Sequence, residues 1–147
     1  MYSKSGTTHL VEHSLALALA AHKGQKDKAG QPYILHPLRI MSKMQTPEEM
    51  SAALLHDVLE DSDMTAEELL AESIPKCVVE AVSCLTKIRN ESYDCFIERV
   101  LTNDLATKVK IADIEDNLNI LRLNQVNDAD LRRIAKYHRA WHKLTST

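Results

Sequence analysis

Two histidines and two aspartates are the residues of this chain best suited to chemistry: His36, the adjacent pair His56-Asp57, and Asp113. His56, Asp57 and Asp113 lie in strongly apolar stretches, where an unpaired polar group carries a large free-energy cost. A bound divalent cation is the simplest partner that removes this cost, because imidazole and carboxylate groups are ligands of such ions. The four side chains therefore predict a metal site.

The same residues also have structural interpretations. A His-Asp pair in a helix can be a core histidine that hydrogen-bonds to its neighbours. Asp113 can form an internal ion pair, either with Lys110 or with a lysine of the early loop. If a metal is bound, two imidazoles and two carboxylates suit Mn²⁺, Fe²⁺ or Zn²⁺ with open positions for water and substrate, and the residue types do not choose among these ions.

Two further carboxylates follow the His56-Asp57 pair by one helical turn. Glu60 lies four residues after His56, and Asp61 lies four residues after Asp57. On a helix both acids would project from the turn beyond the ligand pair, closer to solvent. In a hydrolytic metal site a nearby carboxylate orients the attacking water or takes its proton. We therefore predict that Glu60 and Asp61 are the catalytic acids.

Helical signals run through almost the whole chain and predict an all-α fold. The sequence has only three glycines and four prolines, and no long alternation of apolar and polar residues indicates a sheet. Apart from its serine and the His-Asp pair, the stretch 51–59 is apolar on every side, which predicts a buried helix. Capping boxes at Thr46 and Thr65 mark two helix starts. The remaining helices are expected near residues 9–23, 36–44, 92–102 and 104–121, and from 127 or 128 to 144. A further helix is expected to begin near Pro75 and to hold Cys77 and Cys84.

Length and composition predict one globular domain over residues 1–147. A chain of 147 residues that is 44% hydrophobic can bury one core. The formal net charge of -3 argues against a nucleic-acid polymer or an acidic membrane surface as partner, and no stretch is long enough to span a bilayer. Three cysteines without a CxxC pair predict reduced thiols and a cytoplasmic location, and Cys77 and Cys84 are expected to be buried. The apolar helices slightly favour a homodimer.

Several motifs in order resemble the hydrolase domain of the RelA/SpoT alarmone enzymes, which are HD-domain metal-dependent phosphohydrolases. The resemblance covers about residues 12–123 and is carried by the segments AHKGQKDKAGQPYILHP, AALLHDVLEDSDMT, LTK and VKIADIEDN. The short stretch between Lys87 and Lys110 is similar to that of compact stand-alone bacterial HD proteins. The resemblance implies a single-domain helical HD-type bundle.

The resemblance also implies roles for individual residues. His36, His56, Asp57 and Asp113 would bind the metal, which is Mn²⁺ in the better-known relatives, and Glu60 and Asp61 would activate water. The residues of the substrate pocket would be Lys28, Tyr33 and Asn117, and Lys26 would be a further basic contact. Lys87 and Lys110 would be phosphate or structural partners. The implied reaction removes the 3′-pyrophosphate from guanosine tetra- or pentaphosphate.

Four positions depart from the family pattern and bear on the substrate. Asp27 stands where the family has an arginine that packs against the guanine base, and Ile114, Asp116 and Asn119 replace two arginines and a histidine. Another phosphorylated nucleotide or phosphate ester is therefore an alternative substrate. A non-catalytic metal-binding or nucleotide-binding module is an alternative to an enzyme, but such a module has no need of Glu60 and Asp61.

Overall fold

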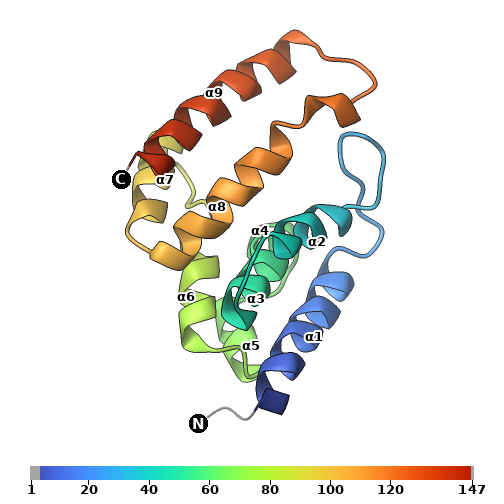
Figure 1. Ribbon diagram of the computed structural model, residues 1–147, viewed down its shortest axis with the longest axis vertical. Coiled ribbons are helices and arrows are strands. Elements are labelled where there is room, and N and C mark those ends of the chain that lie inside the picture. Colours follow the sequence, from blue (N-terminus) through green and yellow to red (C-terminus); the bar gives the residue numbers. More distant parts are fainter. Residues whose placement is uncertain (1–3, 147) are drawn as a thin grey trace.

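The computed structural model describes residues 4–146, which fold into helices joined by short loops (Figure 1). No β-strand occurs among these residues, and the all-α prediction is confirmed. In chain order the elements are α1 (Lys4–Ala21), α2 (Leu35–Ser42), α3 (Pro47–Leu55), α4 (Val58–Asp61), α5 (Ala66–Ala71), α6 (Lys76–Cys84), α7 (Tyr93–Leu101), α8 (Asp104–Asn117), the 3₁₀ helix η1 (Ile120–Arg122) and α9 (Asp128–Thr145).

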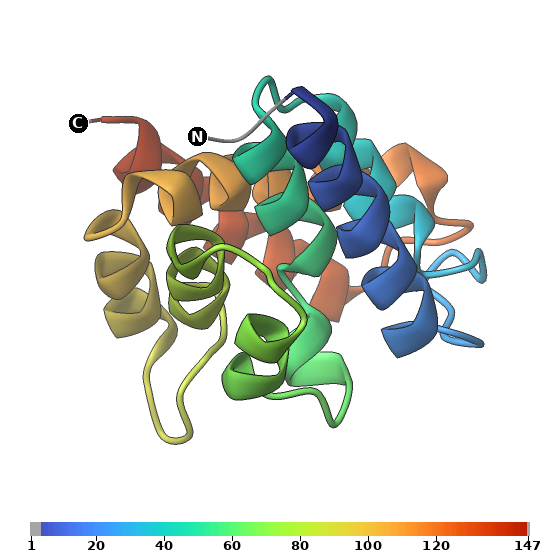
Figure 2. The ribbon, with the colours of Figure 1, turned by 90° about the horizontal axis from the view of Figure 1, so that it is seen from below.

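Helix α3 lies at the centre of the molecule and packs against α1, α2, α6 and α8. Five consecutive residues of this helix, from Ser51 to Leu55, are buried, which confirms that it is buried on every side. Its one polar core residue is satisfied across the interface, because the Ser51 hydroxyl lies 2.6 Å from that of Ser14 on α1. Figure 2 shows α1 running alongside α3, with the α6–α7 connection extending away from the helices.

Side-chain caps fix several of the helix starts. Thr65 and Glu68 form the predicted reciprocal capping box, and Asn127 and Asp130 form another at the start of α9. The capping box predicted at Thr46 is only half formed: its hydroxyl accepts from the backbone of residue 49, but the carboxylate there pairs with a lysine of α8. That long-range ion pair replaces the reciprocal capping bond.

Helix α8 ends at Asn117, four residues earlier than the sequence pattern predicts. The Asp116 carbonyl oxygen would accept from the residue 120 amide in a longer helix, but here it accepts from the Arg122 guanidinium at 2.8 Å. The chain then turns through η1 and reverses direction, so that α9 packs back against α8 (Figure 1). This reversal brings α9 residues to the site described below.

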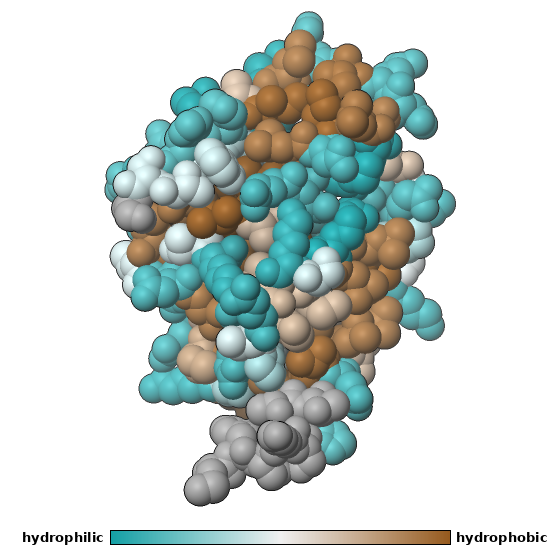
Figure 3. Space-filling view, in the orientation of Figure 1, coloured by the Kyte–Doolittle hydropathy of each residue, from teal (hydrophilic) through white to brown (hydrophobic). Residues whose placement is uncertain are grey.

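The surface carries some apolar residues, and it also contains thiols that were expected in the core. Figure 3 shows a broad apolar area at the end of the molecule where η1 and the start of α9 lie; Leu121, Val126 and Leu131 of this segment are exposed. Cys77 is exposed and Cys84 is half-buried, so the prediction that both are core residues is wrong. Within residues 4–146, every helix is too short or too polar to cross a bilayer.

Candidate metal centre and pocket

The four predicted ligands come from three separate parts of the fold and meet at one point. His36 lies in the first turn of α2, Asp113 lies near the end of α8, and His56 and Asp57 lie between α3 and α4. The Nε2 atom of His36 is 2.9 Å from Asp113 Oδ1, and the Nε2 atom of His56 is 3.0 Å from Asp57 Oδ2. The two rings pack edge to face with centroids 5.2 Å apart. The structure therefore brings all four side chains together.

His56 and Asp57 do not lie within a continuous helix, contrary to the prediction. Helix α3 ends at Leu55 and α4 begins at Val58. The His56 ring bonds through Nδ1 to the Ala53 carbonyl oxygen at 2.6 Å, and a side-chain bond of this kind competes with the helical backbone bond to the same oxygen. The resulting break turns both side chains toward α2 and α8.

Each imidazole is oriented by an acceptor on its outer side. Because a carbonyl oxygen only accepts, the bond to Ala53 places a proton on His56 Nδ1. His36 Nδ1 donates in the same way to Asp116 Oδ2 at 2.6 Å. Metal-bound histidines in proteins are usually fixed by such a bond from their second nitrogen. Both rings thus present the Nε2 atom to the shared centre.

This arrangement fits a divalent cation. When each ring is neutral with its proton on Nδ1, the Nε2 atom of His36 and of His56 carries a lone pair that faces carboxylate oxygens. Such a pairing is repulsive unless a proton or a metal cation lies between the two atoms. His56 Nε2 is buried and has no hydrogen-bond partner among the described residues. Burial opposes a charge on this ring, but Asp57 and Asp113 outweigh burial and raise the pKa of His56 well above its usual value. The centre therefore attracts positive charge.

Asp113 forms the ion pair with Lys110 that the sequence left open, and it also faces the histidines of the candidate metal site. One oxygen faces His36, and the other accepts from Lys110 Nζ at 2.8 Å. The Asn117 amide donates to Asp113 Oδ1 at 3.0 Å and fixes the carboxylate further. Burial opposes ionisation, but Lys110 and the two histidines lower the pKa of Asp113 well below its usual value. An internal ion pair and a candidate metal ligand therefore coexist in one residue.

Asp116 is a site residue that the sequence reasoning missed. Besides accepting from His36, its carboxylate accepts from Arg39 Nε at 2.7 Å and from Arg39 Nη2 at 3.0 Å. Burial opposes ionisation, but the bonds from His36 and Arg39 lower the pKa of Asp116 well below its usual value. The available signal was its position three residues after Asp113, on the same face of α8.

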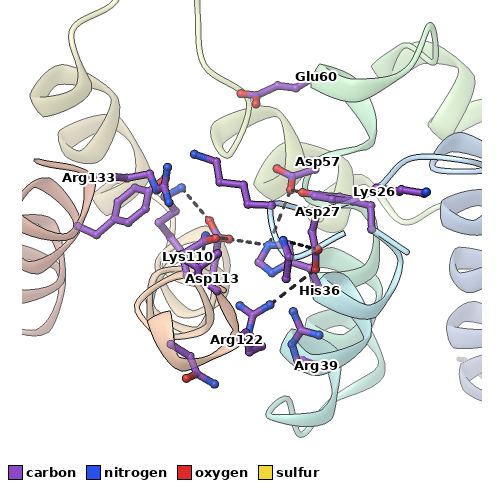
Figure 4. Close-up of a pocket in the computed structure, with 17 residues that line it drawn as sticks. Lys26, Asp27, His36, Arg39, Asp57, Glu60, Lys110, Asp113, Arg122 and Arg133 are labelled. Carbon is purple, nitrogen blue, oxygen red and sulfur yellow. Dashed lines mark hydrogen bonds and ion pairs between the residues drawn. The ribbon is translucent and has the colours of Figure 1, made fainter. Parts of the chain in front are cut away.

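A cavity of about 390 Å³ is lined by three of the candidate ligands, His36, Asp57 and Asp113 (Figure 4). The four predicted substrate residues, Lys26, Lys28, Tyr33 and Asn117, all line it. The Tyr33 hydroxyl donates to Asp57 Oδ2, so this residue also positions a candidate ligand. Further basic residues that line the cavity are Arg39, Lys110, Arg122 and Arg133. The walls are therefore suited to a phosphorylated ligand.

The two predicted catalytic acids occupy different positions. Glu60 lines the cavity, and its Oε1 atom accepts from the Lys87 backbone at 2.6 Å. Asp61 is exposed and lies outside the cavity lining; its carbonyl oxygen accepts from the Gln25 amide at 3.0 Å. Burial and then Asp57 raise the pKa of both acids above their usual values. Glu60 is thus the better placed of the two.

Asp27 stabilises the lysine-rich loop through hydrogen bonds. Its Oδ1 atom accepts from the backbone of Ala29 and of Gln31, both at 2.9 Å, and so holds the lysine-rich loop. Its Oδ2 atom faces Arg122 Nη1 at 3.7 Å and links the loop to η1. Arg122 was also missed by the sequence reasoning, because no local pattern indicates which loop a distant arginine will reach.

Comparisons with known proteins agree with this geometry. A family model described as HD domain matches residues 14–117. The chain is 33% identical over 140 residues to a guanosine-3′,5′-bis(diphosphate) 3′-pyrophosphohydrolase of Vibrio cholerae, covering 86% of this chain and 20% of the relative. It is 33% identical over 135 residues to the bifunctional (p)ppGpp synthase/hydrolase SpoT of Escherichia coli, covering 82% of this chain and 19% of that protein. The chain thus spans about a fifth of the length of these curated relatives.

A solved structure shares the whole fold. It comes from work titled "A metazoan ortholog of SpoT hydrolyzes ppGpp and plays a role in starvation responses" and matches with a TM-score of 0.80 and 22% sequence identity. The match covers 100% of this chain and 89% of that chain. These findings confirm the resemblance to the RelA/SpoT hydrolase region, and the family implies a divalent metal ion, which the His and Asp cluster fits. The chain belongs to the HD domain family.

Proposed function

We propose that this chain is a metal-dependent phosphohydrolase that removes the 3′-pyrophosphate from guanosine tetra- or pentaphosphate. One observation carries the proposal: two imidazole lone pairs and two carboxylates converge beside a cavity with basic walls. The relatives named above, a 3′-pyrophosphohydrolase and a synthase/hydrolase of guanosine bis(diphosphate), support the choice of substrate. The test is a panel of an alarmone, nucleotides and dinucleotides with added Mn²⁺. If none of these compounds is hydrolysed in a metal-dependent reaction, the proposal is rejected.

In this proposal His36, His56, Asp57 and Asp113 hold the ion, which we expect to be Mn²⁺. When bound, the ion supplies Lewis-acid polarisation of a phosphoryl oxygen and lowers the pKa of bound water. Glu60, assisted by Asp61, orients the attacking water and accepts its proton. The water oxygen forms a bond to the phosphorus that is attached to the ribose 3′ oxygen. The bond between this phosphorus and the 3′ oxygen then breaks. The 3′ oxygen takes up a proton, and the products are GDP or GTP and pyrophosphate.

The substrate contacts follow from the groups that remain free in the cavity. Lys26 and Lys28 have ammonium groups suited to phosphate oxygens. The Asn117 amide nitrogen is already bonded to Asp113, so its side-chain oxygen is the group left to accept from a ribose hydroxyl. Tyr33 shapes the wall beside Asp57. The domain span of residues 1–147, the cytoplasmic location and the homodimer stay predictions.

Another phosphorylated nucleotide is a second candidate substrate, and Asp27 favours it. The Asp27 carboxylate is engaged by two backbone amides, and it cannot supply the planar cation that the family pattern provides for stacking on guanine. We expect guanosine tetraphosphate to be hydrolysed no faster than its adenine counterpart. Side-by-side measurement of kcat/KM for the two nucleotides tests this. A clear preference for guanine would contradict it.

Replacing Asp116 with alanine should weaken metal binding without removing a ligand. His36 would lose the carboxylate that fixes its ring, and loss of such an orienting group typically lowers metal affinity about 10- to 100-fold. Calorimetric titration of the purified variant with Mn²⁺ measures the change in Kd. Glu115→Ala is the matched control, because it removes the neighbouring exposed carboxylate of α8. Equal Kd values for Asp116→Ala and the wild type would show that this bond does not support the metal.

A further inference from the structure

Glu60, the proposed general base, is bonded to a backbone amide of the loop that joins α6 to α7 (Figure 2). This loop comprises residues 85–92. Glu60 is an exposed residue on α4, a helix of only four residues. In the described part of the chain the Lys87 amide is the only hydrogen-bond donor to its carboxylate, and the nitrogen lies 2.6 Å from Oε1. A long exposed side chain regains rotamer freedom when such a bond is lost. The orientation of the base therefore depends on the orientation of this amide.

The same peptide group is held from its other side by Arg99 of α7. The Lys87 amide and the Thr86 carbonyl oxygen belong to one trans peptide group, whose N–H and C=O point in opposite directions. Arg99 Nη2 donates to the Thr86 carbonyl oxygen at 2.8 Å. Because the peptide group is planar, a bond that fixes its oxygen also fixes the direction of its N–H. Arg99 is thus connected to Glu60 through one rigid unit.

The Arg99 guanidinium is itself fixed by several partners. Its Nε atom donates to Glu91 Oε2 at 2.9 Å and its Nη2 atom donates to Glu91 Oε1 at 3.0 Å, which makes a bidentate ion pair. Its Nη1 atom donates to the Cys84 carbonyl oxygen at 3.1 Å, at the end of α6. The guanidinium carbon also lies 5.6 Å from the centroid of the Phe96 ring. One cation therefore joins the end of α6, the loop and α7, and it has little freedom to leave the Thr86 oxygen.

We propose that Arg99 is a positioning residue for hydrolysis, because it orients the peptide group that holds Glu60. The proposal rests on the proposed function, since it takes Glu60 as the group that orients the attacking water. Arg99 is not among the described residues that line the cavity, so its effect passes through the loop and not through contact with substrate. Without the guanidinium, the Thr86 carbonyl oxygen loses this donor and the peptide group can rotate, which takes the amide away from Glu60. The chemical step then slows while substrate and metal still bind.

Kinetics of Arg99→Met in two backgrounds test this role, with guanosine tetraphosphate as substrate at saturating Mn²⁺. In the otherwise wild-type chain the change should lower kcat by about 10- to 100-fold, the loss expected when a catalytic group is misplaced, and should leave KM within about twofold. In a Glu60→Gln background the proton acceptor is already absent, so Arg99→Met should lower kcat by less than about twofold further. Equal factors in the two backgrounds would overturn the proposal, because a general structural loss acts in both.

Three controls accompany the kinetics. Arg99→Lys keeps a charged donor for the Thr86 oxygen and should recover part of the rate. If Arg99→Met does not fold, Arg99→Lys is judged by the same comparison of the two backgrounds. Arg89→Met removes an exposed cation of the same loop and should keep the wild-type kcat. Metal content and melting temperature verify that each variant is folded and loaded.

The NMR resonance of the Lys87 amide proton separates failure of this role from failure of the proposed function, because it does not depend on turnover. A short bond to a carboxylate shifts an amide proton downfield, so the wild type should show such a shift and Glu60→Gln should reduce it. Arg99→Met should reduce the shift and speed exchange of this proton with solvent. A wild-type shift in Arg99→Met would overturn the role of Arg99. A reduced shift, in a protein whose wild type hydrolyses no nucleotide, would support orientation of Glu60 by Arg99 and overturn the hydrolase alone.

Discussion

Replacing Asp113 with alanine is expected to abolish binding of the divalent ion and hydrolysis of the nucleotide. The change removes a candidate ligand that joins α8 to α2, because Asp113 Oδ1 lies 2.9 Å from His36 Nε2. An ion held at a thousand times its Kd stabilises a folded chain by about 4 kcal/mol, so Mn²⁺ should raise the melting temperature of the wild type by on the order of 10 °C. It should leave that of the variant unchanged. Metal analysis after dialysis and melting curves with and without Mn²⁺ are the measurements.

Two further variants separate loss of metal from loss of structure. Asp113→Ala also leaves the buried Lys110 ammonium unpaired, which destabilises the fold by about 3–5 kcal/mol whether or not metal is bound. Asp113→Asn keeps the side-chain shape, and His56→Ala removes another candidate ligand without touching this ion pair. If His56→Ala and Asp113→Ala both keep the wild-type metal content and the wild-type rise of melting temperature on addition of Mn²⁺, the ligand set is wrong.

Replacing Glu60 with glutamine is expected to lower kcat by about 10²- to 10⁴-fold, the usual contribution of a positioned general base. Glutamine keeps an oxygen that accepts from the Lys87 backbone, so the local structure should persist while the proton acceptor is lost. Metal content should stay at the wild-type value. Single-turnover measurement of pyrophosphate release at saturating Mn²⁺ gives the rate of the chemical step.

Asp61→Asn tests whether the catalytic role is shared between the two acids. The structure places Glu60 in the cavity lining and Asp61 outside it, so the loss in Asp61→Asn should be the smaller of the two. Glu115→Gln, at an exposed position on α8, is the control for loss of a carboxylate. Full activity in Glu60→Gln would show that Glu60 is not the base of the proposed mechanism.

Much of this fold could be predicted because its signals are local. The burial of α3 follows from five consecutive residues with no polar face, and the cap at Thr65 follows from a four-residue pattern. His56, Asp57 and Asp113 could be identified because each polar side chain stands among apolar residues, and His36 could be identified from the resemblance of its motif. Only the structure shows that the four side chains meet.

The rest could not be predicted because it depends on contacts between distant segments. The helix ends before His56 because its side chain competes for the Ala53 carbonyl oxygen. Helix α8 ends early because the Arg122 side chain bonds to the Asp116 carbonyl oxygen. From the sequence, Asp116 was interpreted only as the replacement of a basic residue of the family pattern. Its partners His36 and Arg39 are about 80 positions away in the chain, so no local pattern indicates these contacts. The cationic edge of the cavity depends on how α9 packs on α8.

The central claim is that this centre hydrolyses a phosphorylated nucleotide with the help of a divalent ion. Its most direct test is the release of pyrophosphate from guanosine tetraphosphate by the wild-type protein, first stripped with a chelator and then supplied with Mn²⁺. We predict no release after stripping, and restored release with GDP and pyrophosphate in equal amounts after Mn²⁺ is added. Equal release with and without the metal, or no release at any Mn²⁺ concentration, would contradict the claim.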